Sequence, residues 1–166
     1  YKKDELTDYN CPFYYKQNDD SMKCISSSST CVVNGFNYVY DKECKKNCDN
    51  YYVLMDESSS SPEPKKCFDK IQDILDKNIK YCDLKLKQCW LNYPSNFYIK
   101  YKFVIDGHEI EEVTDECEKY YYEQGTSPNI QKYSIDNCKN KDYFYEEGNK
   151  KCAESCADFI NNNKYY

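Results

Sequence analysis

A short cysteine-centred phrase recurs four times along this chain. In each copy a Cys is followed, after two intervening residues, by a pair of large apolar residues, and both are aromatic in the first three copies. The copies are Cys11–Tyr15, Cys48–Tyr52, Cys117–Tyr121 and Cys156–Ile160. The second and fourth copies have another Cys four positions upstream, at Cys44 and Cys152. Small units repeated around Cys are typical of chains that are organised by covalent cross-links and not by one large apolar core.

The composition favours such a stapled, modular chain. The 166 residues include 12 Cys and 20 Tyr, and the mean hydropathy is −1.01, so few aliphatic side chains are available for a core. Disulfides compensate in small units, each contributing roughly 2–4 kcal/mol. Because disulfides persist in oxidising compartments, the Cys density predicts a secreted or cell-surface protein. A structural zinc site is disfavoured, since the sequence has no Cys-x2-Cys pair and a single His.

The charge pattern disfavours nucleic acid as a partner. The net charge is −6, and all 23 basic residues are Lys, whereas Arg is the preferred residue for bidentate base and phosphate contacts. The Lys residues are interspersed with Asp and Glu, which is typical of a solvated surface. No apolar run is long enough to span a membrane. The chain opens on Tyr1 without Met or an apolar leader, so we expect a mature chain or a segment of a longer one.

Residues 1–61 are interpreted as Cys-rich module or modules with a β-hairpin. The hairpin is predicted around Asn34-Gly35, because both central positions of a type I′ turn need positive φ. The Ser- and Pro-rich stretch that follows is interpreted as a boundary.

Residues 62–96 are interpreted as a helical insertion. Apolar residues at steps of three and four predict one amphipathic helix over 65–80, which could continue to Trp90. They are Phe68, Ile71, Leu75, Ile79, Cys82 and Leu86.

Residues 97–166 are interpreted as a second Cys-rich module that repeats the first. A hairpin is predicted over 97–113, with Asp106-Gly107 as its turn. The order of aromatic strand, acidic turn, Cys-x3-Cys and aromatic pair occurs at 38–52 and again at 143–160. The predicted fold is therefore a small, disulfide-rich, repeat-like α+β protein, made of β-hairpin modules with one amphipathic helix.

All twelve cysteines are expected to form disulfides. They are Cys11, Cys24, Cys31, Cys44, Cys48, Cys67, Cys82, Cys89, Cys117, Cys138, Cys152 and Cys156. Analogy between copies of the phrase suggests the pairs Cys11–Cys24, Cys48–Cys67 and Cys117–Cys138. Spacing alone leaves many other connectivities open.

The two ends of the chain both resemble half of a repeat unit. Three explanations are open. The chain is cut from a longer repeat array, Cys156 pairs within the chain near Cys152, or consecutive subunits complete each other's half-units to make a polymer.

The stretches 44–53 and 150–156 resemble the Cys-rich repeats of protist surface proteins, of the trichomonad, entamoebid and ciliate type. Those repeats are loosely related to growth-factor-receptor and furin-like Cys repeats. This chain has Cys-x3-Cys where that family has Cys-x2-Cys. The resemblance implies cell-surface display, adhesion or coat formation, and it supplies no catalytic residues.

No pattern in the sequence favours an enzyme. His108 beside a turn and the carboxylates of 109–116 could form a catalytic or calcium site, but neither has the spacing of a known motif. We expect no catalytic residue, no metal site and no cofactor.

The aromatic residues are the favoured candidates for a binding face, since Tyr and Trp offer rigid amphipathic contact area. The candidates are Tyr51, Tyr52, Trp90, Tyr101, Tyr120 and Tyr121. Two Ser runs could accept O-linked sugars: Ser26, Ser27, Ser28 and Ser29, and Ser58, Ser59, Ser60 and Ser61.

Two functions remain open at this point. The first is an extracellular structural or adhesive surface protein, associating with itself into a coat or fibre. The alternative is a secreted or surface binding module that recognises a glycan or a host protein through its Tyr and Trp residues.

Overall fold

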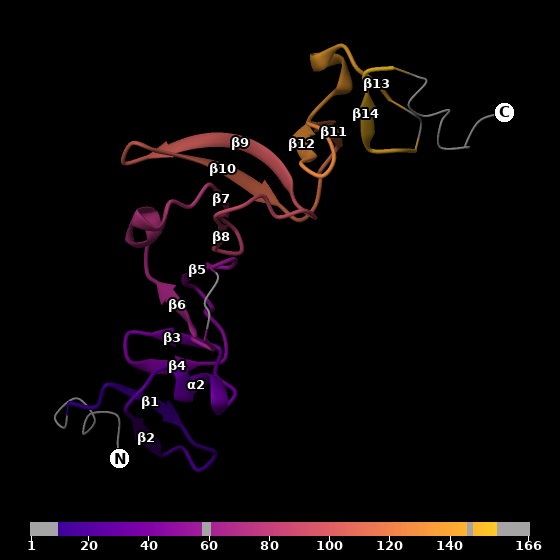
Figure 1. Ribbon diagram of the computed structural model, residues 1–166. Coiled ribbons are helices and arrows are strands. Elements are labelled where there is room, and N and C mark those ends of the chain that lie inside the picture. Colours follow the sequence, from indigo (N-terminus) through magenta and orange to yellow (C-terminus); the bar gives the residue numbers. More distant parts are fainter. Residues whose placement is uncertain (1–9, 58–60, 146–147, 156–166) are drawn as a thin grey trace. The chain divides into compact units, whose positions relative to one another are not determined.

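The computed structural model describes residues 10–57, 61–145 and 148–155. The chain divides into two compact units (Figure 1). The first unit comprises Tyr1–Ile79 with Lys85–Leu91, and the second comprises Lys80–Leu84 with Asn92–Tyr166. Both units are built almost entirely from short strands.

The described residues of the first unit form seven strands, one helix and one 3-10 helix. The strands are β1 (Phe13–Lys16), β2 (Met22–Ile25), β3 (Tyr38–Tyr40), β4 (Glu43–Lys45), β5 (Tyr52–Leu54), β6 (Lys65–Phe68) and β8 (Gln88–Trp90). The helices are α2 (Ser29–Val33) and the 3-10 helix η1 (Ile71–Lys77).

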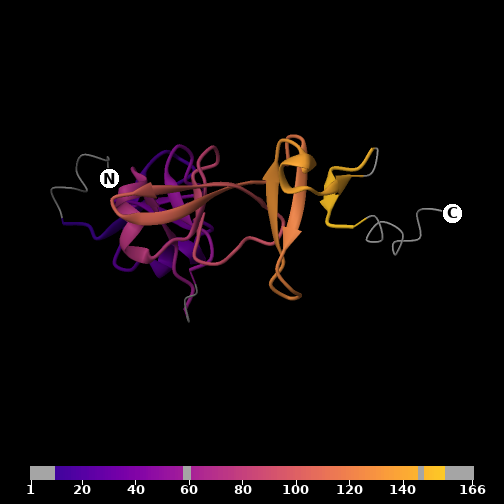
Figure 2. The ribbon, with the colours of Figure 1, turned by 90° about the horizontal axis from the view of Figure 1, so that it is seen from above.

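In the part of the second unit that the structure describes, there are another seven strands and a 3-10 helix. The strands are β7 (Tyr81–Asp83), β9 (Tyr98–Ile105), β10 (His108–Thr114), β11 (Tyr120–Gln124), β12 (Gln131–Ile135), β13 (Phe144–Tyr145) and β14 (Lys151–Ala153), and the 3-10 helix is η2 (Cys138–Lys141). Figure 2 shows the same strands from a second direction.

One pairing rule builds both units. Consecutive strands form an antiparallel hairpin, and the first strand of each hairpin pairs in parallel with the second strand of the next hairpin. The antiparallel hairpins are β1–β2, β3–β4, β5–β6, β9–β10, β11–β12 and β13–β14. The parallel junctions are β1–β4, β3–β6 and β5–β8 in the first unit and β7–β10, β9–β12 and β11–β14 in the second. We call this arrangement the hairpin ladder.

Disulfides close most of the hairpins at the same place. A Cys ahead of the first strand bonds to a Cys in the second strand, as in Cys11–Cys24 and Cys48–Cys67. Cys31–Cys44 and Cys138–Cys152 repeat this arrangement, with the first Cys on a short helix. Cys82 and Cys89 are also disulfide-bonded, which brings the bonded cysteines in the described residues to ten.

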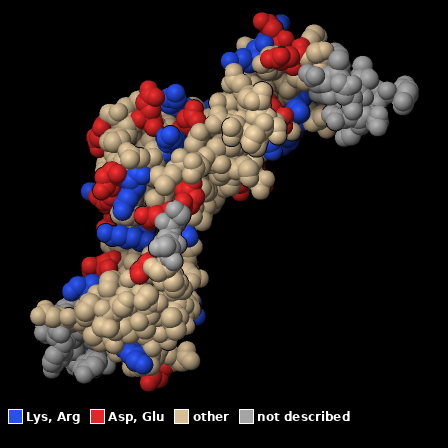
Figure 3. All heavy atoms as spheres, in the orientation of Figure 1, with Lys and Arg blue, Asp and Glu red and all other residues tan. Residues whose placement is uncertain are grey.

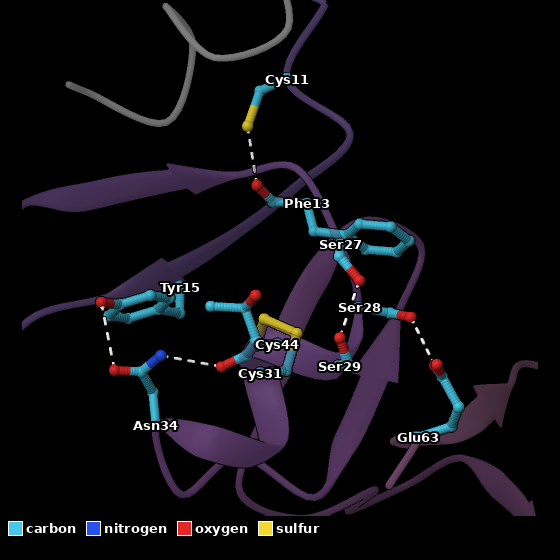
Figure 4. Close-up of a disulfide and its surroundings, with 11 residues drawn as sticks. Cys11, Phe13, Tyr15, Ser27, Ser28, Ser29, Cys31, Asn34, Cys44 and Glu63 are labelled. Carbon is cyan, nitrogen blue, oxygen red and sulfur yellow. Dashed lines mark hydrogen bonds between the residues drawn. A yellow bond between two sulfur atoms is a disulfide. The ribbon is translucent and has the colours of Figure 1, made fainter. Parts of the chain in front are cut away.

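The cystines form the centres of small cores. Cys31 and Cys44 are 0% and 3% exposed, and their disulfide lies near Tyr15 (Figure 4). Ile25 belongs to the same buried cluster. In the second unit, Cys138 and Cys152 pack among tyrosines that flank them. Aromatic rings and sulfur therefore fill the space that aliphatic side chains fill in larger domains.

Two of the three predicted cysteine pairs are present. Cys11–Cys24 and Cys48–Cys67 are formed, but Cys117–Cys138 is wrong, because Cys138 is bonded to Cys152. Cys138 begins η2, ahead of β13, so it belongs to the hairpin that follows Cys117. Cys117 has no disulfide and is buried, whereas Cys156 lies outside the described residues.

The amphipathic helix predicted over 65–80 is wrong, and the fold is mostly β instead of α+β. Lys65–Phe68 forms β6, which pairs with β5, and helical structure is confined to Ile71–Lys77. The Cys67 disulfide fixes the start of the segment in a hairpin, and Asn78, with φ of 58°, ends η1. Ile71, Ile74 and Leu75 of η1 are buried. The apolar spacing that predicted a long helix therefore corresponds to one short 3-10 helix.

The hairpin predicted at Asn34-Gly35 is also wrong. Ser29–Val33 forms α2, and Gly35, with φ of 86°, lies just past the helix end, where Gly is favoured. The hairpin lies further along the chain, where the turn that joins β3 to β4 contains Asp41, with φ of 56°.

The second predicted hairpin is confirmed. β9 and β10 pair antiparallel, with His108 opposite Ile105 and Asp106-Gly107 between them. Both turn residues have positive φ, at 49° and 80°, which Asp and Gly tolerate better than most residues. The aromatic strand predicted at 143–145 is present as β13.

Among the described residues, no helix is long and apolar enough to cross a membrane.

Candidate functional site

The parallel junctions of the hairpin ladder share one side-chain pattern. Each junction has an aromatic residue on its first strand, and the corresponding residue of the next hairpin is a Lys in five of the six junctions. In two junctions these residues are paired, as Tyr38 with Lys65 and Tyr81 with Glu111. In the other four they come directly before the paired residues, as Phe13 and Lys42, Tyr52 and Lys87, Tyr98 and Lys132, and Tyr120 and Lys150.

Two of these junctions contain a cation–π contact. Lys87 Nζ lies 5.4 Å from the centre of the Tyr52 ring, and Lys132 Nζ lies 5.4 Å from the centre of the Tyr98 ring. Such contacts contribute about 0.5–1 kcal/mol at exposed sites. In these two junctions the aromatic residue therefore contacts a Lys of the neighbouring hairpin.

The ladder ends at an edge strand in each unit. In the first unit β2 pairs with β1 alone among the described strands, and in the second unit β13 pairs with β14 alone. Unpaired strand edges are sites where another chain can add a strand.

The edge strand β13 carries exposed aromatic rings. Phe144 and Tyr145 are 52% and 59% exposed, although Tyr145 still packs against Tyr120, with ring centres 5.7 Å apart. Phe144 on β13 corresponds to Tyr120 on β11. Phe144 directly precedes Tyr145, which is opposite Cys152, and Tyr120 directly precedes Tyr121, which is opposite Ser134. It is thus a junction aromatic with no next hairpin beside it in the described part of the chain.

Tyrosines pack closely behind this edge. Tyr122 stacks on Tyr133 at 5.2 Å and meets Tyr143 edge-on at 5.6 Å. Desolvation, with a hydrogen bond from its hydroxyl to Glu154, raises the pKa of Tyr143. These contacts hold β13 and β14 against the hairpin before them.

The six predicted binding-face residues are divided between the two units. Three lie in the first unit, where Trp90 is buried at 9% exposure, Tyr51 stacks on Tyr40 at 4.2 Å, and Tyr52 contacts Lys87.

The other three lie in the second unit. Tyr101 is 53% exposed and meets Phe103, Tyr121 packs edge-on against Tyr98, and Tyr120 contacts Tyr145. Sequence reasoning missed Phe144 and Tyr145, whose position relative to Cys152 could have identified them.

The remaining candidates are placed as follows. His108 is exposed at the start of β10, and the described residues contain no group of three or more His, Cys, Asp or Glu that could hold a metal ion. Ser28 donates a hydrogen bond to Glu63 at 2.6 Å, and Ser27 and Ser29 bond to each other at 2.8 Å (Figure 4). Ser61 is exposed, whereas Ser58–Ser60 lie outside the described residues.

Acidic and basic side chains are intermixed on the face shown in Figure 3. The exposed ion pairs follow the same pattern, as with Lys102 and Glu109, which lie 3.7 Å apart across the β9–β10 hairpin. The visible surface therefore offers no strong field of one sign to steer a charged partner.

Comparison with known proteins does not assign the chain to a family: no family model matches it, and no similar curated protein or solved structure was found.

Proposed function

We propose that this chain is an extracellular structural protein whose copies associate with one another into a coat or fibre. The observation that supports this proposal is the open hairpin ladder, in which one type of parallel junction recurs six times and edge strands end the ladder at β2 and β13. A structure extended by one repeated junction can be extended further by the same junction.

The disulfides support the extracellular part of the proposal. The ten bonded cysteines in the described residues suit an oxidising environment. They also suit a structural role, because each disulfide stabilises a hairpin whose apolar core is too small to be stable alone.

The two edges support linear growth over closed dimers. β2 is the second strand of its hairpin and β13 is the first strand of its own, so the two edges are of different kinds. Contacts between unlike surfaces are heterologous, and they produce open filaments unless the rotation between subunits closes a ring.

The test is the size of the oxidised, full-length chain over a wide range of protein concentration. Light scattering after size-exclusion chromatography and negative-stain electron microscopy should show species that grow with concentration and are elongated. The chain reduced and alkylated under denaturing conditions is the control and should not form them. A strictly monomeric oxidised chain at the highest soluble concentration would refute self-association.

A further inference from the structure

Five of the six parallel junctions share a single register. We call the second-strand Cys of a hairpin, or the residue in its place, the staple position. In each of these five junctions, the first-strand residue opposite the staple position of its own hairpin pairs with the residue just before the staple position of the next hairpin. The pairs are Tyr14 with Glu43, Val39 with Lys66, Val53 with Gln88, Ile99 with Tyr133, and Tyr121 with Lys151. In the sixth junction, Cys82 pairs with Glu112, which likewise comes just before a staple position, that of Val113. A register repeated in both units is a property of the repeat and not of any one pair of side chains.

Backbone hydrogen bonds fix this register. The N–H groups of Tyr14, Val53 and Tyr121 donate to carbonyls of the next hairpin at 2.9, 3.0 and 2.8 Å. Antiparallel strands alternate between residue pairs that exchange hydrogen bonds and pairs that do not. Tyr14, Val53 and Tyr121 lie in pairs that do not exchange hydrogen bonds within their own hairpin, so their N–H groups point toward the next hairpin.

Tyr145 occupies the same position at the edge of the second unit. It lies opposite Cys152, as Tyr14 lies opposite Cys24, so its N–H is directed away from β14. At the edge of the first unit the staple position is Cys24, and the residue just before it, Lys23, is exposed.

We infer that β13 of one copy pairs in parallel with β2 of a second copy, with Tyr145 opposite Lys23. This inference rests on the proposed self-association and specifies its interface. The second copy would extend the ladder by the junction that each unit already contains three times.

The side chains at this interface are consistent with the pairing. Phe144 supplies the aromatic residue that all six junctions have on the first strand, and its 52% exposure leaves room for a neighbour. The facing position, which holds Lys42, Lys87 or Lys150 in other junctions, holds Met22 in β2. A thioether packs well against an aromatic ring, so Met22 and Phe144 are a suitable pair.

A backbone substitution tests the hydrogen bond without removing the hairpin. Tyr145→Pro deletes the outward N–H, and Pro is tolerated on an edge strand where that group faces away from the sheet. We expect the dissociation constant for self-association to rise about tenfold or more, since the partner's carbonyl is left unsatisfied. Tyr145→Ala is the matched control, because it removes the same ring but retains the N–H, and it should weaken association less than Tyr145→Pro does.

Cross-link mapping tests the register independently of any folding defect. A photoreactive benzoylphenylalanine is placed at Tyr145 in the full-length chain, which is mixed with isotope-labelled wild type and irradiated. Mass spectrometry should place the interchain cross-links in β2, centred on Lys23. An intact Cys138–Cys152 bond in the Pro variant confirms that its last hairpin is folded.

The possible outcomes separate this inference from the proposed function. If the chain assembles but the cross-links fall outside β2, or if Tyr145→Pro assembles as well as Tyr145→Ala, the inferred interface is overturned and self-association stands. If the wild-type chain does not assemble, both are overturned.

Discussion

Cys117 Sγ lies 4.0 Å from Ser134 Oγ across the β11–β12 hairpin. Ser134 is opposite Tyr121, in the staple position that Cys24 and Cys152 occupy in their own hairpins. Cys117 precedes β11 as Cys11 precedes β1. The β11–β12 hairpin therefore has the first cysteine of the recurring disulfide, Cys117, but Ser134 in place of the second.

Ser134→Cys should complete the missing staple. The new disulfide would close a loop of about the size for which chain entropy predicts roughly 3 kcal/mol of stabilisation. Alkylation under denaturing, non-reducing conditions should label Cys117 in the wild type and leave it unlabelled in the variant, and urea unfolding should shift to higher concentration. Ser134→Ala is the control, in which Cys117 should still be labelled. Continued labelling of Cys117 in Ser134→Cys would mean that the two positions are not in register.

The β9–β10 hairpin has an apolar contact in place of a staple. Val113 holds the staple position opposite Ile99, and the two are 1% and 2% exposed. Val113→Ala should destabilise the second unit by about 2 kcal/mol, through lost burial and a residual cavity. Val104→Ala on the same hairpin, where the side chain is 63% exposed, should change stability by less than about 0.5 kcal/mol. Urea unfolding followed by circular dichroism measures both, and equal effects would contradict the buried role of Val113.

The junction Lys residues should contribute measurably to stability. Lys132 Nζ lies 5.4 Å from the Tyr98 ring centre and 5.9 Å from that of Tyr121, so it contacts rings on two hairpins. Lys132→Gln is expected to cost about 0.5–1 kcal/mol in urea unfolding. The exposed Lys119 gives a control of equal charge change, since Lys119→Gln should have little effect. If both substitutions have the same effect, net charge and not the ring contact is responsible.

Alkaline pH should weaken the contact between β3 and the residues after β6. The Tyr40 hydroxyl donates to the Asp69 carboxylate at 2.9 Å, and this hydrogen bond, with desolvation, raises the pKa of Tyr40 to about 12. Because the folded pKa lies above the ordinary value of 10.0, the stabilisation is complete below pH 10 and is lost as the pH rises through about 12. Nuclear magnetic resonance of ring-labelled Tyr, with Tyr40→Phe for assignment, should show this pKa. Asp69→Asn should lower it toward 10.0, and an unchanged value would exclude Asp69 as the cause.

The cysteine pattern predicted two of three disulfides correctly, and local signals predicted the Asp106-Gly107 hairpin but not the structure of residues 65–80. The Cys11–Cys24 and Cys48–Cys67 pairs follow from analogy between copies, because each staple position recurs at a fixed place in its hairpin. The residues of 65–80 have helical spacing, yet the Cys67 staple commits their start to a strand. A covalent bond of this kind outweighs the few tenths of a kcal/mol per residue that separate helix from strand propensity.

The candidate interface was beyond sequence reasoning for a topological reason. The predicted binding face included Tyr52, and the structure places Tyr52 at a parallel junction, where its ring contacts Lys87 of the next hairpin. The strand left at the edge depends on which strands of successive hairpins pair in parallel, and predicting the antiparallel hairpins alone does not give that order. Only with that order does Phe144 stand out from the other aromatic residues.

Disulfide mapping of the natively oxidised chain tests the hairpin ladder most directly, and every prediction above depends on that ladder. Mass spectrometry of non-reduced peptides should find Cys11–Cys24, Cys31–Cys44, Cys48–Cys67 and Cys138–Cys152, with no bond from Cys117 to Cys138. Finding Cys117 bonded to Cys138 would contradict the ladder, because the last two hairpins could then not share its register.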